Sequence, residues 1–159
     1  AYQTLPTPRD WLETLAATAA FGAFALGVGF GTGLFRGIEP VPASDLFPGL
    51  LFWIIFPALA EETLFRVLPL NPHASRLRLR IAVVAAGAAF VLWHPLAAAV
   101  IRPEIRVTFW DLRFLTIVAG LAGACSALYL RTGSIWPPAV LHWITVVVWR
   151  WGLGGPEGV

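Results

Sequence analysis

Residues 56–66 read Phe-Pro-Ala-Leu-Ala-Glu-Glu-Thr-Leu-Phe-Arg. They place two adjacent carboxylates, Glu61 and Glu62, and the cation Arg66 inside a segment, residues 46–70, that is otherwise almost wholly apolar. Burying one charge at the centre of a bilayer costs at least about 2.5–3.5 kcal/mol. Three charges so close together therefore need partners or shelter. We expect them to form the functional centre, which the rest of the chain houses.

The composition of the chain is that of an integral membrane protein. Of its 159 residues, 58% are hydrophobic and 13% are charged. Soluble domains have about 45–50% apolar and about 25% charged residues. A net charge of +2, with no basic stripe carrying stacking aromatics, argues against nucleic acid as a partner. We expect an all-α integral membrane protein with a single transmembrane domain over residues 1–159.

Apolar segments long enough to cross about 30 Å of hydrocarbon recur along the chain. They predict a compact bundle of about five transmembrane helices, at residues 11–35, 46–70, 81–101, 114–130 and 135–151. Pro57 lies inside the second segment, so a kink is expected just before the acidic pair. In the first segment, glycines at every second position from Gly27 to Gly33 favour close helix packing. Arginines divide evenly between the two sides, so their count assigns no topology.

Few ionisable side chains lie clearly within these segments, and they come from only three of them. They are Glu61, Glu62, Arg66, His94 and His142. Ionisable residues inside a membrane usually face the interior of a bundle or a water-filled cavity and mark function. We therefore expect the three helices to converge, and we take all five residues as candidate catalytic residues.

The two glutamates are expected to have different roles. Glu62 and Arg66 are one helical turn apart and can pair on one face of the helix. Glu61 is rotated about 100° from Glu62 and addresses a different neighbour. A carboxylate facing a desolvated cavity is a competent general base. Glu62 is thus expected to be structural, held ionised by Arg66, and Glu61 to act on the substrate.

His94 and His142 are candidates to donate hydrogen bonds to a developing oxyanion or to orient a water. With one or two glutamates they equally suit a divalent metal, although no His-Glu-x-x-His spacing is present. By helical rise, Glu61 lies roughly 10–14 Å from the membrane face carrying residues 71–80, His142 about 10 Å and His94 roughly 20 Å. A common site therefore requires the third helix to extend beyond Arg80 or to tilt.

Three motifs in this chain resemble those of a known family, over roughly residues 46–150. In order they are Glu61-Glu62-x-x-x-Arg66, Phe90-x-x-x-His94 and a histidine on a late helix, His142. They are similar to the successive motifs of the CAAX protease and bacteriocin-processing family, also called CPBP or Abi. Its members are intramembrane glutamic proteases. The resemblance implies an endopeptidase of the membrane, acting in CAAX prenyl-protein processing, bacteriocin leader removal or regulatory cleavage.

The resemblance also implies a role for each candidate residue. Glu61 would activate the water that attacks a peptide bond, with Glu62 and Arg66 in support. His94 and His142 would line the site and stabilise the tetrahedral intermediate.

One position departs from the family pattern. The last motif commonly reads His-x-x-x-Asn, and Val146 stands where the Asn donor is expected. Losing one oxyanion donor typically costs about 10²–10³ in rate. Thr145, one residue away, has a hydroxyl. An alternative function is therefore a catalytically reduced member serving as a structural or assembly subunit of a larger membrane complex. A third is ligation of haem, chlorophyll or a metal by His94 or His142.

The expected partners follow from these functions. They are the lipid bilayer and a membrane-associated peptide or protein substrate, or else a larger membrane complex. For the protease we expect no cofactor and no metal. A bacterial inner membrane, or another internal membrane, is the expected location. A single cysteine, Cys125, excludes an intrachain disulfide. Residues 2–10 lack the pattern of a cleavable signal peptide, so none is expected there.

Overall fold

The computed structural model describes residues 1–155, except for the side chains of residues 43, 45 and 46. Within these residues the chain forms helices and no strand, as its composition predicts. The long helices are α1 (Pro8–Gly31), α4 (Arg76–Val100), α6 (Leu112–Thr132) and α7 (Trp136–Gly152). The single domain expected over the whole chain includes residues 156–159, which lie outside the described residues.

Short helical elements connect the long ones. Between α1 and α4 lie α2 (Ala43–Trp53), the π-helical η1 (Ile54–Leu59), α3 (Ala60–Glu62) and the π-helical η2 (Thr63–Val67). Between α4 and α6 lie the 3-10 helix η3 (Pro103–Ile105) and α5 (Arg106–Phe109). The candidate acidic pair therefore lies on the short helix α3, flanked by two π-helical turns.

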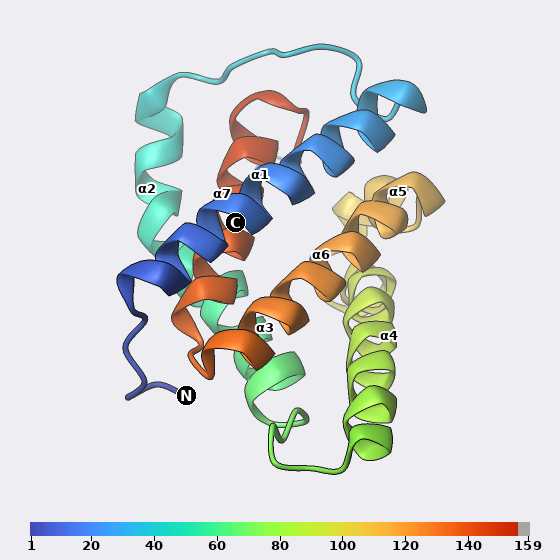
Figure 1. The fold of residues 1–159 in the computed structure, drawn as a ribbon. Helices are drawn as coiled ribbons and strands as arrows, with labels where there is room; N and C mark the ends of the chain where they lie inside the picture. The colour runs from blue at the N-terminus through green and yellow to red at the C-terminus, as the bar shows by residue number, and fades with distance from the viewer. Residues whose placement is uncertain (156–159) are drawn as a thin grey trace.

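Helix α6 is the centre of the packing. It contacts α1, α4 and α7, and α2 and η1 pack against α7. Figure 1 shows α1 and α6 running side by side across the molecule, with α4 at one edge and α2 at the opposite edge. Phe90 of α4, Cys125 of α6 and Leu141 of α7 are each fully buried in one core cluster. This core brings together the helices that carry His94 and His142.

Three of the described helices are long and apolar enough to cross a membrane, namely α1, α4 and α6. The chain is an integral membrane protein. The expected second span, residues 46–70, is not one helix, because Phe56 has an extended backbone (φ −127°, ψ 118°) just before Pro57. This break confirms the kink that Pro57 predicts. Helix α7 has 17 residues. A bundle of five spans therefore stays a prediction.

Helix α4 begins earlier than the apolar pattern indicates. Its first residue is Arg76, and Ser75 caps it by accepting a hydrogen bond from the amide of Arg78 (3.5 Å). The expected span began at residue 81, where the side chains become apolar. The helix thus extends beyond Arg80, which is one of the two ways in which His94 could reach a site shared with Glu61 and His142.

Helix α6 begins with a charged cap outside its apolar region. The carboxylate of Asp111 accepts a hydrogen bond from the amide of Arg113 (2.8 Å) and pairs with the Arg113 guanidinium. The Arg113 side chain, assisted by its amide, lowers the pKa of Asp111 to about 2. This arrangement satisfies a free amide at the helix start and places a negative charge at its positive end.

The glycines from Gly27 to Gly33, in the last turns of α1 and just after it, do not pack as expected. A Cβ at Gly27, Gly31 or Gly33 would meet nothing within 4 Å, whereas one at Gly29 would overlap the ring of Phe35. The amide of Phe35 also donates to the carbonyl of Gly29 (3.0 Å). The stripe therefore does not form a helix–helix interface among the described residues. One of its glycines instead admits the chain that turns back after α1.

Candidate active site

The backbone around the acidic pair is irregular. In η2, the amide of Leu68 donates to the carbonyl of Thr63 (3.0 Å), a bond across five residues. Such π turns widen a helix and are frequent at functional sites. On the other side, the extended residue Phe56 redirects the chain. The single α-helical turn that carries Glu61 and Glu62 is thereby set apart from the flanking segments. Glu61 meets α4 and faces α7, and Glu62 meets α7.

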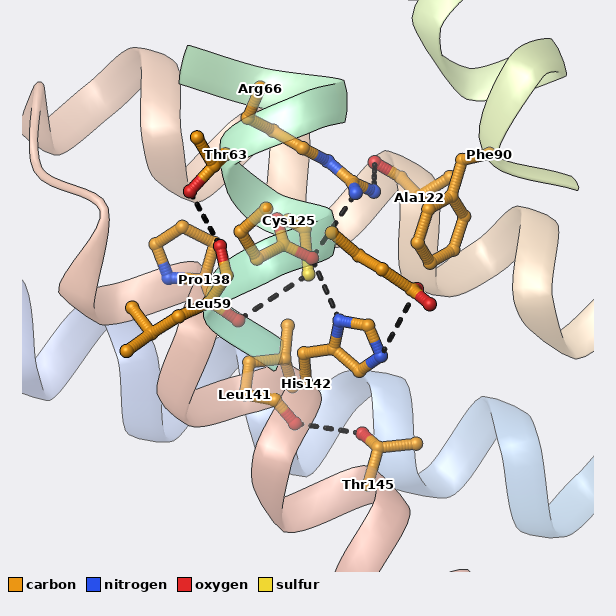
Figure 2. A network of polar contacts seen from close by, with 12 residues as sticks. Leu59, Thr63, Arg66, Phe90, Ala122, Cys125, Pro138, Leu141, His142 and Thr145 are labelled. Atoms are coloured by element: carbon orange, nitrogen blue, oxygen red, sulfur yellow. Dashed lines mark hydrogen bonds and ion pairs between the residues drawn. The ribbon is translucent and has the colours of Figure 1, made fainter. Parts of the chain in front are cut away.

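Glu62, Arg66 and His142 form a buried network. The Glu62 side chain is 0% exposed, and its Oε1 lies 3.1 Å from Nη1 of Arg66 and 2.9 Å from Nδ1 of His142. Arg66 also donates to the carbonyl of Ala122 (3.3 Å), and its guanidinium lies 4.3 Å from the centre of the Phe90 ring. Figure 2 shows Arg66, Phe90 and His142 converging from three elements. The pairing of Glu62 with Arg66 expected from their spacing is confirmed.

This network fixes the hydrogen on His142. A carboxylate oxygen only accepts, so Nδ1 of His142 must carry the hydrogen that it shares with Glu62. In the neutral ring, Nε2 then has a free lone pair. That nitrogen lies 3.9 Å from Oε2 of Glu61. Glu62 thus fixes the orientation of the His142 ring, whose other nitrogen is on the side of Glu61.

Glu61 is held differently from Glu62. Its Oε1 accepts a hydrogen bond from the indole N–H of Trp93 (3.0 Å). Its Oε2 is buried and has no hydrogen-bond partner among the described residues. The side chain is 14% exposed. One oxygen of Glu61 is therefore anchored, and the other is without a partner in the described part of the chain. Oε2 of Glu62 is also buried without a partner among the described residues, but the Glu62 side chain is 0% exposed. The two glutamates have different surroundings, as their positions on the helix predict.

His94 joins the site through an aromatic contact and not through the glutamates. Its Nδ1 donates to the carbonyl of Phe90 (2.9 Å). The Phe90 ring centre lies 5.1 Å from that of His94 and 5.7 Å from that of His142. Helix α4 begins before Arg80, and the Phe90 ring contacts both histidine rings. His94 therefore lies near His142, although helical rise alone predicted different depths for them.

A cavity of about 700 Å³ connects these residues. Glu61, His94 and His142 line it, and most of the remaining lining is apolar. Val146 and Thr145 also line it. The Thr145 hydroxyl donates to the carbonyl of Leu141 (2.8 Å) in its own helix, as Figure 2 shows, so its hydrogen is already used. The volume and apolar lining are typical of a binding site.

The sequence alone did not identify Trp93 as a partner of Glu61. A signal was present, because a buried indole N–H needs an acceptor and Trp93 is the neighbour of His94 in a wholly apolar segment. The two residues lie on adjacent faces of α4, and only the tertiary structure shows that Trp93 is the one that meets Glu61. Among the described residues, no group of three or more His, Cys, Asp or Glu side chains is placed to hold a metal ion.

Comparisons with known proteins place the chain in a family. No curated protein and no solved structure matches it. A family model described as type II CAAX prenyl endopeptidase Rce1-like matches residues 43–148, which is more than half of the chain. The matched region contains all five candidate residues and Val146. The chain therefore belongs to the Rce1-like family of type II CAAX prenyl endopeptidases.

Proposed function

We propose that this protein is an intramembrane endopeptidase in which Glu61 activates a water molecule for attack on a peptide bond of a CAAX prenyl protein. One observation carries the proposal. The available oxygen of Glu61 and the available nitrogen of His142 face each other at 3.9 Å beside an apolar cavity. The family match supports the class of reaction, and the apolar lining suits a substrate with a prenyl chain.

The geometry around Glu61 suits a bound water. Oε2 of Glu61 and Nε2 of neutral His142 are both acceptors, because Nδ1 of His142 donates to Glu62. A water between them donates one hydrogen to each. Its lone pairs then point away from both residues, toward the cavity. Holding the nucleophile in this orientation removes the entropic cost of positioning it.

The proposed reaction balances its protons through Glu61. As the water oxygen bonds to the carbonyl carbon, one O–H bond breaks and its proton passes to Glu61. The tetrahedral intermediate then collapses, the C–N bond breaks, and the Glu61 carboxylic acid returns the proton to the leaving amine. The products are a new carboxyl terminus and a free amine. General base and general acid steps of this kind contribute about 10²–10⁴ in rate.

His94 is proposed to line the site beside the tetrahedral intermediate. Its Nδ1–H is committed to the carbonyl of Phe90, so the neutral ring offers the cavity an acceptor and no second donor. Val146 has no donor, so the site has fewer oxyanion donors than the family motif provides, and we expect slow turnover.

We also propose that the chain crosses the membrane five times. Helices α1, α4 and α6 supply three crossings by length and composition. The broken segment from α2 to η2 and helix α7 would supply the other two. Their apolar sequences support this, and an irregular backbone is tolerated at membrane depth where protein covers it or a cavity adjoins it.

The experiment that tests the proposed function is cleavage of a farnesylated CAAX peptide by purified protein in vesicles. We expect the wild type to cleave it and Glu61→Gln to be at least about 10²-fold slower. Glu39→Gln, which removes an exposed carboxylate outside the cavity, is the control and should cleave at the wild-type rate. A wild type that does not cleave would instead favour the structural-subunit alternative, whose main support is Val146.

A further inference from the structure

Two arginines line the same cavity as Glu61. Arg150 lies on α7 about two turns after His142, and Arg102 follows the end of α4 about two turns after His94. Two turns correspond to a rise of about 11–12 Å. The mostly apolar cavity thus has the acidic site at one position and cations roughly 12 Å further along both helices.

The two arginines differ in their partners. Arg102 pairs with Glu104 (2.7 Å). Arg150 is partly buried, and its Nε is buried without a hydrogen-bond partner among the described residues. Its guanidinium lies 4.8 Å from the centre of the Trp53 ring. A ring contact of this kind uses the face of the guanidinium, and hydrogen bonds from its N–H groups lie in its plane. Arg150 is therefore the cation that an anionic ligand in the cavity would meet.

We propose that Arg150 binds the C-terminal carboxylate of the substrate and so places the peptide bond after the prenylated cysteine at Glu61. This proposal rests on the proposed function. It adds the contact by which the protease would recognise its substrate. A guanidinium binds a carboxylate through two parallel hydrogen bonds, a geometry that favours this anion.

The lengths agree with this placement. In a CAAX terminus, three residues follow the prenylated cysteine. Three extended residues span at most about 10–11 Å. A carboxylate held by Arg150 would therefore put the bond after the cysteine near the level of His142 and Glu61, given the roughly 12 Å of helical rise from His142 to Arg150. A chain one or two residues longer would move that bond past the site. The contact would act as a ruler for the last three residues.

The test measures binding, so that it does not depend on cleavage. In a Glu61→Gln background, two farnesylated CAAX peptides are compared, one with a free C-terminal carboxylate and one with a C-terminal amide, in vesicles of uncharged lipid. We expect the amide to bind at least about 30-fold more weakly, because it leaves a desolvated cation unpaired. Adding Arg150→Gln should remove this difference by weakening binding of the acid alone, and Arg150→Lys should keep part of it.

The matched control is Arg106→Gln. Arg106 is exposed and lines a separate surface pocket, so its removal changes the net charge equally without altering the cavity. In the Glu61→Gln background, Arg106→Gln should leave the preference for the peptide with a free carboxylate unchanged. The proposal is overturned if acid and amide bind equally to the parent or if neither binds. It is also overturned if Arg150→Gln weakens both alike, the pattern of an arginine that only contacts lipid headgroups or stabilises the fold. If the peptide acid binds more tightly than the amide but the wild-type protein does not cleave the peptide, only the proposed reaction is rejected.

Discussion

At the scale of single residues, the cavity contains one side chain that limits the proposed chemistry. Val146 lines the cavity one turn after His142, and its isopropyl group donates no hydrogen bond. Thr145 does not replace the missing donor, because its hydroxyl is bonded to Leu141. A carboxamide at position 146 would project from the same turn into the same cavity.

We predict that Val146→Asn accelerates cleavage of a farnesylated CAAX peptide, by at most about 10²–10³-fold, since that is the usual contribution of one oxyanion donor. The turnover number should rise more than KM changes, because the new bond forms mainly in the transition state. Val147→Asn adds the same group next to the cavity but not in its lining and is the control. No gain for position 146, or the same gain at both positions, would contradict this role.

Residue-scale features could be predicted only where they are local in sequence. The pair Glu62–Arg66 follows from one helical turn and is present at 3.1 Å. The contacts of Glu61 with Trp93 and His142 join residues 32 and more positions apart. Helical spacing shows that Glu61 faces elsewhere but not what it faces. That information lies in the tertiary arrangement, which places Trp93 of α4 and His142 of α7 beside Glu61.

At the scale of elements, the apolar patterns predicted where the helices lie, but they did not predict where α4 begins or where the π-helical turns occur. Helix α4 starts at Arg76 because a helix needs a cap, which Ser75 supplies, and not an apolar side chain. Pro57 marks the break in the second segment. The π-helical turns on both sides of Glu61 and Glu62 have no comparable sequence signal, since the same side chains suit an ordinary α-helix.

Helix α1 offers a matched test of packing at this scale. We predict that Gly29→Ala lowers the unfolding temperature in detergent, because its methyl group would overlap the Phe35 ring and overpacking costs about 1–3 kcal/mol. Gly27→Ala, in the same helix and with nothing within 4 Å, should raise it slightly, because alanine favours a helix by about 1 kcal/mol over glycine. Equal effects of the two substitutions would contradict the packing of Phe35 on Gly29.

At the scale of the whole molecule, the proposed five crossings make a prediction about sides. If the segment from α2 to η2 crosses the membrane, the loops before and after it lie on opposite sides. We predict that Ile38→Cys and His73→Cys, both at exposed positions, react with an impermeant thiol reagent from opposite sides of sealed vesicles. The native Cys125 is fully buried, so the parent protein should remain unlabelled. If both cysteines are labelled from the same side, the segment from α2 to η2 does not cross the membrane and the prediction is wrong.

The overall class was predictable because composition alone separates a membrane protein from a soluble one. The packing of the other helices around α6 could not be predicted. Helices α1, α4 and α7 are all largely apolar, and in lipid the hydrophobic effect does not favour one helix pair over another. The buried charges restrict the choice, because Glu62, Arg66 and His142 are only tolerated together. That requirement favours a fold in which Glu62 of α3 meets His142 of α7, as it does here.

The central claim is that the two adjacent glutamates have separate roles, and one paired measurement tests it most directly. Cleavage of a farnesylated CAAX peptide and the unfolding temperature are measured for Glu61→Gln and Glu62→Gln. We predict that Glu61→Gln loses at least about 10²-fold in cleavage with an unchanged unfolding temperature. Glu62→Gln should lose cleavage and also unfold at lower temperature, because it leaves Arg66 buried without its counter-charge, at a cost of about 3–5 kcal/mol. Wild-type cleavage by Glu61→Gln would contradict the account.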